Sequence, residues 1–151
     1  KKLLTNNSFY NNLFVLQKLL YKYNNMMDIK GIGIDIINIK RMKEMVAKYG
    51  DRFLNRIFTE KEINNFQNNK NSIENFAGRF AAKEAVIKAT KKHLSVKDIE
   101  ILRRKDGEPF VAGKENILVS ISHEREYAIA MAIIREGGNE SCIGWWNNKS
   151  R

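Results

Sequence analysis

The first clear pattern in the chain is an alternation of apolar residues with small or polar ones over residues 30–37. A period of two is typical of a strand whose two faces differ. One face carries three isoleucines, and the other carries two glycines and a carboxylate: Ile32, Ile34 and Ile36 against Gly31, Gly33 and Asp35. We therefore predict a strand here, followed by a helix that Asn38 caps and that ends near Gly50.

Two further helices are predicted before the C-terminal half. A short one begins at Thr59, where Thr59 and Glu62 have the spacing of a capping box. The longest runs over residues 73–91. At about 100° per residue, its large apolar residues fall within roughly 60° of one another and are expected to form its buried stripe: Ile73, Phe76, Phe80 and Ile87.

Strands are predicted late in the chain, over residues 98–104, 116–122 and 127–135, with turns around residues 106–107 and 123–126. Helices that come first and an antiparallel sheet that follows are typical of the α+β class. The expected architecture is an antiparallel sheet packed against one long helix.

Composition divides the chain into three parts. Its 151 residues suit a single domain, and its formal net charge is +10. We assign residues 28–136, with 21 basic and 16 acidic residues, to the domain and residues 137–151 to a tail. Residues 1–27 hold four lysines and no acid, which fits an organelle transit peptide or its remnant, and equally an ordinary first helix. A transit peptide would place the protein in a plastid-like organelle, and otherwise it would be cytoplasmic.

The cysteine count and the hydropathy exclude several classes of protein. A lone Cys142 cannot form an intramolecular disulfide framework or a cysteine-based zinc site. No run approaches 18 apolar residues, so a membrane-spanning helix is not expected. The excess of positive charge indicates an anionic partner without identifying it.

Two carboxylates contradict their local patterns. Asp35 shares the strand face of the two glycines, which either leave room for a ligand or serve tight packing while Asp35 caps the next helix. Glu84 lies about 40° from Phe80 on the helix, at the edge of the apolar stripe, where an unpaired carboxylate is unfavourable. It could simply pair with Lys88 one turn away.

Together, Asp35 and Glu84 could instead hold Mg²⁺, with waters and phosphate oxygens completing the coordination shell. The long helix would then also supply positive charge to a phosphate, through Arg79, Lys83 and Lys88.

Four motifs occur in a fixed order between residues 31 and 128. They are GIGIDI at 31–36 followed by IKR at 39–41, FTEKE at 58–62, FAGRFAAKEAVIKA at 76–89, and SISH at 120–123 with EYA at 126–128. In sequence and spacing the chain resembles the holo-[acyl-carrier-protein] synthases over about residues 30–135.

This resemblance implies the short, single-domain 4′-phosphopantetheinyl transferase fold, usually a homotrimer with active sites in clefts between protomers. It implies Mg²⁺-dependent transfer of 4′-phosphopantetheine from coenzyme A to a serine of apo-acyl carrier protein, with release of adenosine 3′,5′-bisphosphate. Such a transferase would serve fatty-acid biosynthesis and lipid metabolism. The expected partners are coenzyme A and acyl carrier protein, with no nucleic acid and no membrane.

The resemblance also implies roles for individual residues. Asp35 and Glu84 would be the metal ligands, and a carboxylate, directly or through a metal-bound water, would remove the proton of the acceptor serine. Lys88 would neutralise charge on the leaving pyrophosphate oxygen, and three further side chains would orient phosphates: Arg79, Lys83 and His123. The acidic carrier would dock on the basic helix after Asp35, at Lys40, Arg41 and Lys43.

Two positions depart from the family pattern. Asn38 stands where the family usually has Glu, on the docking helix. Residues 90–93, TKKH, stand where the family usually has a Gly-Thr-Gly loop. Lys91 and Lys92 could there meet the 3′-phosphate of coenzyme A by charge instead of through the backbone.

Two other functions remain open at this point. One is a basic nucleic-acid-binding domain, which the 16 acidic residues of the domain disfavour. The other is a Mg²⁺-dependent phosphate-ester enzyme without a carrier-protein acceptor.

Overall fold

The computed structural model describes residues 29–66 and 72–136. The expectations for residues 1–27 and for the tail therefore lie outside the described residues. The elements follow one another as β1 Ile29–Asn38, α2 Ile39–Ile57, α3 Glu60–Phe66, α4 Ser72–Thr90, a 3₁₀ turn η1 Val96–Asp98, β2 Ile101–Arg103, β3 Pro109–Val111, β4 Ile117–His123 and β5 Tyr127–Arg135.

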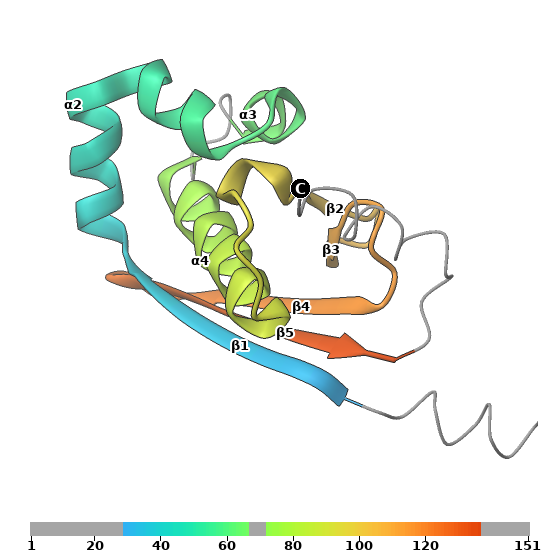
Figure 1. Cartoon of the computed structure of the whole chain (residues 1–151). Helices are drawn as coiled ribbons and strands as arrows, with labels where there is room; N and C mark the ends of the chain where they lie inside the picture. The colour runs from blue at the N-terminus through green and yellow to red at the C-terminus, as the bar shows by residue number, and fades with distance from the viewer. Residues whose placement is uncertain (1–28, 67–71, 137–151) are drawn as a thin grey trace, which may run out of the picture.

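A three-stranded antiparallel sheet in the order β1-β5-β4 lies under α4, and β2 and β3 form a small separate sheet (Figure 1). The first and last strands pair along their whole length, from Ile29 opposite Arg135 to Asn38 opposite Tyr127. The helices gather on one face of the three-stranded sheet (Figure 1). The α+β prediction, with an antiparallel sheet against a long helix, is confirmed.

The two glycines of β1 allow α4 to lie directly against the strand. A Cβ atom on Gly33 would stand 2.0 Å from the carbonyl oxygen of Ala85, and one on Gly31 would stand 2.0 Å from that of Ala89. Neither distance is sterically allowed, so only glycine fits at these two positions. Of the two interpretations of the glycine face, tight packing is the one that the structure supports.

Five alanines are buried on α4 where the predicted stripe had large apolar side chains, which corrects that prediction. Phe76 is buried as expected, but Ile73, Phe80 and Ile87 are only half-buried. The residues against the sheet and the neighbouring helices are small: Ala77, Ala81, Ala82, Ala85 and Ala89 are all buried. Side-chain size misled the prediction, because a close helix–strand contact selects small residues at its centre.

Apolar side chains form two clusters on either side of α4. One lies between α4 and the sheet and includes Ala85, Ile117 and Ala132. The other packs α2 and α3 against the first half of α4, and includes Leu54, Phe58 and Phe76. Helix α4 therefore belongs to both clusters and fixes the sheet relative to α2 and α3.

Two predicted elements have clearly different bounds in the structure, and one strand was not predicted. Gly50 (φ 52°, ψ −139°) kinks α2 instead of ending it, and the helix continues to Ile57. The strand predicted over 98–104 is shorter, because η1 takes its first residue and β2 begins at Ile101. The sequence did not indicate β3, which has only three residues and depends on pairing with β2. Within the described residues, no helix is long and apolar enough to cross a membrane.

Candidate active site

Asp35 and Lys88 meet where α4 crosses β1. The Lys88 Nζ atom donates to Asp35 Oδ1 at 2.7 Å and to the carbonyl oxygen of Ile34 at 3.0 Å. The Lys88 side chain remains half-exposed, whereas that of Asp35 is only 15% exposed. Asp35 does not cap the next helix, because Asn38 accepts the Arg41 amide hydrogen bond at 2.9 Å, as predicted for the cap.

Glu84 is half-buried and lies one helical turn before Lys88. The charges of Asp35 and Lys88 both affect the pKa of its carboxyl group. Burial raises the pKa of its carboxyl group, the negative charge of Asp35 raises it further, and Lys88 lowers it. Two carboxylates from different elements therefore act on each other in partly desolvated surroundings. Such a pair favours a bound cation, which removes their mutual repulsion.

The second oxygen of Asp35 indicates what could bind here. Asp35 Oδ2 is buried and has no hydrogen-bond partner. A buried carboxylate oxygen normally has a partner, so this one is suited to a ligand. In the described part of the chain, no group of three or more His, Cys, Asp or Glu side chains could form a metal cage. Two carboxylates fit Mg²⁺, which usually binds through one or two carboxylates with waters and substrate phosphates.

Arg79 and Lys83 are not placed beside Asp35 and Glu84, which corrects the expected phosphate-facing set. Both side chains are fully buried. Lys83 pairs with Glu62 at 2.7 Å, and the Arg79 guanidinium lies 3.8 Å from the centre of the Phe66 ring. Burial lowers the pKa of Lys83, and the Glu62 carboxylate opposes that shift. Of the three cations expected at phosphate, only Lys88 is at this site.

His123 ends β4 and is exposed, but β5 separates its strand from β1. Its register partner is Ala128, which itself pairs with Ile37. Within one protomer, His123 is therefore two strands away from the strand that carries Asp35. The structure does not bring it to the two carboxylates.

Lys91 and Lys92 follow the end of α4 and are exposed. Lys91 has φ 53°, and it is the one residue other than glycine with a positive φ in the described segments. It occupies the left-handed position that often ends a helix and that glycine usually fills.

The three predicted docking residues, Lys40, Arg41 and Lys43, are exposed on the first turns of α2. Arg41 also lines a cavity of about 460 Å³ together with Met45, Phe53, Phe80 and Tyr127. Ile36, the residue that follows Asp35 in the sequence, also lines this cavity. Sequence reasoning missed this apolar groove, although Met42 and Met45, three residues apart on one helix, were a usable signal.

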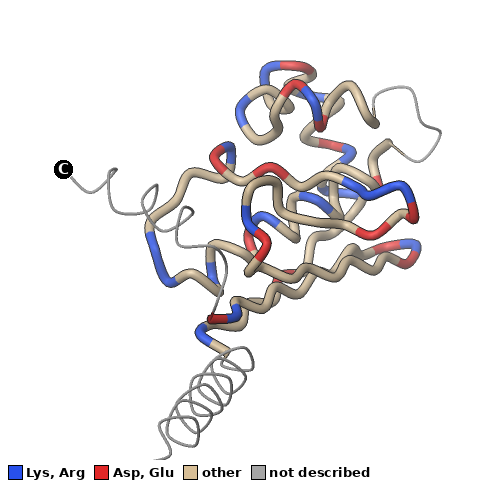
Figure 2. Tube along the Cα trace, turned by 90° about the vertical axis from the view of Figure 1, so that its right-hand side faces the viewer, with Lys and Arg blue, Asp and Glu red and all other residues tan. Residues whose placement is uncertain are grey.

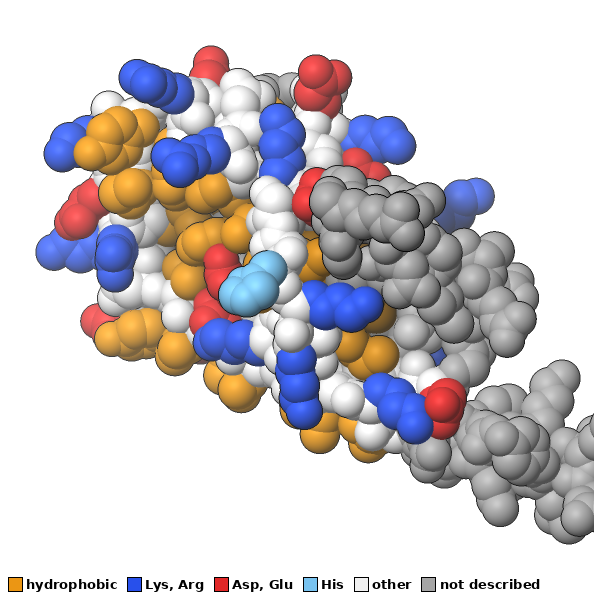
Figure 3. Space-filling view, in the orientation of Figure 1, with side chains coloured by type: hydrophobic (Ala, Val, Ile, Leu, Met, Phe, Trp, Pro, Cys, Tyr) orange, Lys and Arg blue, Asp and Glu red, His pale blue; other side chains and the backbone are white. Residues whose placement is uncertain are grey.

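Basic and acidic side chains are mixed, both along the chain and on the surface that Figure 3 shows. Basic and acidic residues are interspersed along the described chain (Figure 2). On the face shown in Figure 3, acidic side chains lie among basic ones and border apolar side chains. This mixture does not form the continuous basic surface that nucleic-acid binding requires.

The family model of the 4′-phosphopantetheinyl transferase superfamily matches residues 31–132. The chain is 42% identical over 124 residues to the holo-[acyl-carrier-protein] synthase of Halothermothrix orenii, covering 72% of this chain and 99% of that protein. It is 47% identical over 116 residues to the synthase of Listeria monocytogenes, covering 70% and 98%. The chain belongs to the holo-[acyl-carrier-protein] synthases.

Solved synthase structures match the fold over the same region. The structure from Bacillus anthracis, in complex with CoA (3′,5′-ADP), has a TM-score of 0.66 and 38% identity, and covers 72% of this chain and 98% of that one. The synthase from Plasmodium yoelii has a TM-score of 0.63 and 28% identity, with coverage of 74% and 98%. The region that matches the synthases thus includes Asp35, Glu84, Lys88 and His123.

Proposed function

We propose that this synthase transfers 4′-phosphopantetheine from coenzyme A to a serine of apo-acyl carrier protein in a Mg²⁺-dependent reaction that releases adenosine 3′,5′-bisphosphate. One observation carries the proposal. In a chain of this family, the carboxylates of Asp35 and Glu84 interact electrostatically across the contact between β1 and α4. Asp35 Oδ2 has no hydrogen-bond partner, and Lys88 donates to Asp35 Oδ1.

Asp35 and Glu84 are the residues that would hold Mg²⁺, which when bound would neutralise charge on the phosphate oxygens. In the transfer, the serine oxygen forms a bond to the β-phosphorus of coenzyme A. The bond between that phosphorus and the bridging oxygen breaks, and the bisphosphate leaves with the electron pair. A site carboxylate accepts the serine proton, and Lys88 balances the charge on the leaving oxygen. Positioning and charge therefore account for most of the catalysis.

The exposed lysines at the end of α4 are proposed to bind the donor. Lys91 and Lys92 lie one turn beyond Lys88, where they can reach another phosphate of the same coenzyme A molecule. Arg79 and Lys83 are not included, because they are buried.

The carrier is proposed to dock on the first half of α2. Lys40, Arg41 and Lys43 supply positive charge for an acidic partner, and the groove beside Arg41 offers apolar surface. A combined charged and apolar surface supports both rapid encounter and affinity.

The proposed assembly is a homotrimer with active sites between protomers. The sheet face opposite α4 exposes large apolar side chains: Ile32, Ile34 and Ile36 of β1, Leu118 of β4, and Tyr127, Ile129 and Met131 of β5. A contiguous apolar face of this kind marks a protein interface. Within one protomer, β5 separates His123 from the strand that carries Asp35. In the proposed trimer, His123 would therefore reach the site of a neighbouring copy.

The location in the cell is proposed to follow from residues 1–27, whose basic, acid-free composition fits import into a plastid-like organelle. Fusion of these residues to a fluorescent reporter tests this. Accumulation of the reporter in the organelle supports the proposal, and uniform cytosolic fluorescence overturns it.

The transferase activity is tested with coenzyme A, Mg²⁺ and an apo-acyl carrier protein that a bacterial synthase is able to load. Mass spectrometry should show the carrier heavier by one phosphopantetheine, and a carrier whose acceptor serine is replaced by alanine should stay unmodified. An unchanged carrier mass would contradict the proposal. Hydrolysis of coenzyme A without transfer would favour the phosphate-ester enzyme instead.

A further inference from the structure

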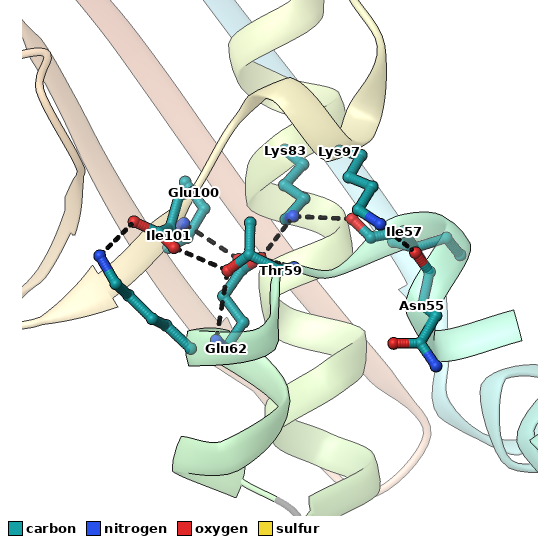
Figure 4. A network of polar contacts seen from close by, with 9 residues as sticks. Asn55, Ile57, Thr59, Glu62, Lys83, Lys97, Glu100 and Ile101 are labelled. Atoms are coloured by element: carbon teal, nitrogen blue, oxygen red, sulfur yellow. Dashed lines mark hydrogen bonds and ion pairs between the residues drawn. The ribbon is translucent and has the colours of Figure 1, made fainter. Parts of the chain in front are cut away.

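A buried ion pair joins α3 to α4 at the residue before Glu84. The side chains of Glu62 and Lys83 are both 0% exposed, and Lys83 Nζ lies 2.7 Å from Glu62 Oε2 (Figure 4). Neither residue reaches the surface or the candidate active site. Two fully desolvated charges in a small domain require an explanation, because ionised side chains are rarely buried completely.

Both charged groups are hydrogen-bonded, and these hydrogen bonds link segments that are distant in the sequence. Glu62 Oε2 also accepts the Thr59 backbone N–H at 2.9 Å, which confirms the predicted capping box, and Oε1 accepts that of Ile101 at 3.0 Å. Lys83 Nζ donates a second hydrogen bond, at 2.8 Å, to the carbonyl oxygen of Ile57. The pair therefore connects the end of α2, the start of α3, the start of β2 and the middle of α4 (Figure 4).

Stability alone does not explain such an arrangement. Desolvation of two charges offsets most of their attraction, and apolar replacements of similar volume are often neutral or stabilising. What a buried ion pair provides is a defined geometry, because its donors and acceptors allow only one alignment. The alanines of the buried α4 surface allow a close approach to β1 but make no directional contacts, so a hydrogen-bonded ion pair adds an orientation that they do not supply.

The alignment of α4 matters because Glu84 directly follows Lys83. When Lys83 Nζ reaches both Glu62 and Ile57, the rotation of the helix is fixed, and with it the direction of the next side chain. That direction brings Glu84 under the influence of Asp35.

We propose that Glu62 and Lys83 are positioning residues that hold Glu84 in place for Mg²⁺. This inference rests on the proposed function for the identity of the metal, but it concerns the alignment of α4. Neither residue touches substrate, and both act through Glu84.

The test replaces the pair with apolar residues of similar size, Glu62→Leu together with Lys83→Met, in the full chain. The double variant should unfold in urea at a midpoint equal to or above that of the wild type. Its affinity for Mn²⁺, used as a spectroscopic substitute for Mg²⁺ and measured by electron paramagnetic resonance without substrates, should fall about 10- to 100-fold. The kcat should fall by a similar factor, with the KM for coenzyme A less affected.

Lys97→Met is the matched control. Lys97 Nζ also donates to a carbonyl oxygen near the end of α2, that of Asn55 at 2.8 Å, but Lys97 is exposed and lies on η1. Its removal should leave Mn²⁺ affinity unchanged. A folded double variant with wild-type Mn²⁺ affinity and kcat would overturn the inference.

If the double variant does not fold, a second variant tests the same inference. Glu62→Asp keeps the charge but shortens the side chain by one methylene, so it shifts α4 without removing the pair. Lower Mn²⁺ affinity of the folded protein supports the inference, and unchanged affinity overturns it. Because Mn²⁺ binding is measured without carrier, these results are independent of whether the wild type transfers phosphopantetheine.

Discussion

Gly33 determines how closely α4 approaches β1, and so how closely Glu84 approaches Asp35. Gly33→Ala would place its Cβ 2.0 Å from the Ala85 carbonyl oxygen and 2.7 Å from the Ala89 nitrogen, both backbone atoms that cannot move alone. We expect a loss of about 3 kcal/mol in the free energy of unfolding, at the upper end for overpacking, and a large loss of activity. Urea unfolding and the transfer assay measure the two effects.

Gly78→Ala is the control for that substitution. Its Cβ would approach only the Cγ2 atom of the Ile121 side chain, at 2.8 Å, and a side chain can rotate away. Equal destabilisation by the two alanines would contradict the close-packing argument for β1.

Glu84→Gln removes one charge from the carboxylate pair without changing the size of the side chain. Transfer should fall at least about 100-fold, since the proposed Mg²⁺ ligand loses its charge. The urea midpoint should stay at or slightly above the wild-type value, because Glu84 is partly desolvated next to Asp35. Glu115→Gln, at an exposed position, should leave activity unchanged. Near-normal transfer by Glu84→Gln would remove Glu84 from the metal site.

Lys91 combines a strained backbone with a candidate role in binding the donor. Because φ is 53° there, Lys91→Gly should raise the free energy of unfolding by about 1 kcal/mol. The same substitution should raise the KM for coenzyme A, since the charge is lost. Lys91→Ala loses the charge but keeps the strain, so it should raise the KM without stabilising the protein. An unchanged KM in both variants would exclude Lys91 from the donor site.

At the scale of elements, α2 is the proposed docking helix, and Arg41 is the basic residue that lines its groove. Arg41→Glu should weaken carrier binding about tenfold or more, because it places like charge against an acidic partner. The KM for coenzyme A should change much less. Steady-state kinetics with each substrate varied in turn measures both constants.

Lys105→Glu makes the same change of charge in the exposed turn between β2 and β3, away from the groove. It should alter neither constant. If Arg41→Glu affects both substrates equally, a specific docking role is wrong.

Elements whose signals are local were predictable from the sequence. The alternation in β1 and the capping box of α3 each depend on a few consecutive residues, and both are confirmed. The continuation of α2 beyond Gly50 was not predictable, because glycine commonly ends helices and only packing of Leu54 and Ile57 in the core restores the helix. The three residues of β3 have no pattern apart from their partner strand.

The same distinction applies to the candidate site. Asp35 and Glu84 were found because each carboxylate interrupts an apolar or small-residue pattern. The burial of Lys83 was not predictable, since it depends on Glu62, 21 residues earlier in the chain. A lysine beside a catalytic carboxylate has the same sequence signal whether it contacts a phosphate or a buried glutamate.

At the scale of the whole molecule, the apolar face of the sheet should determine assembly. Ile34 is 57% exposed and lies opposite Met131 in the register of β1 and β5, on that face. Ile34→Asp should convert the oligomer to monomers and reduce activity at least about tenfold, since a charge in an apolar interface is unfavourable. Sedimentation velocity measures the mass.

Tyr49→Asp is the control for assembly, because Tyr49 is 46% exposed but lies on α2. It should leave the sedimentation coefficient unchanged. A wild-type protein that sediments as a monomer, or an Ile34→Asp variant that still sediments as a trimer, would contradict the proposed interface.

The pairing of β1 with β5 also determines when the candidate active site can form during protein synthesis. Ile29 and Asn38 pair with Arg135 and Tyr127, so β1 lacks its only neighbour in the sheet until β5 has left the ribosome. Contacts between residues so distant in sequence form slowly. Asp35 is among the first site residues to be synthesised and among the last to be fixed. The Mg²⁺ proposed to bind Asp35 and Glu84 should therefore be acquired only after translation of the domain is complete.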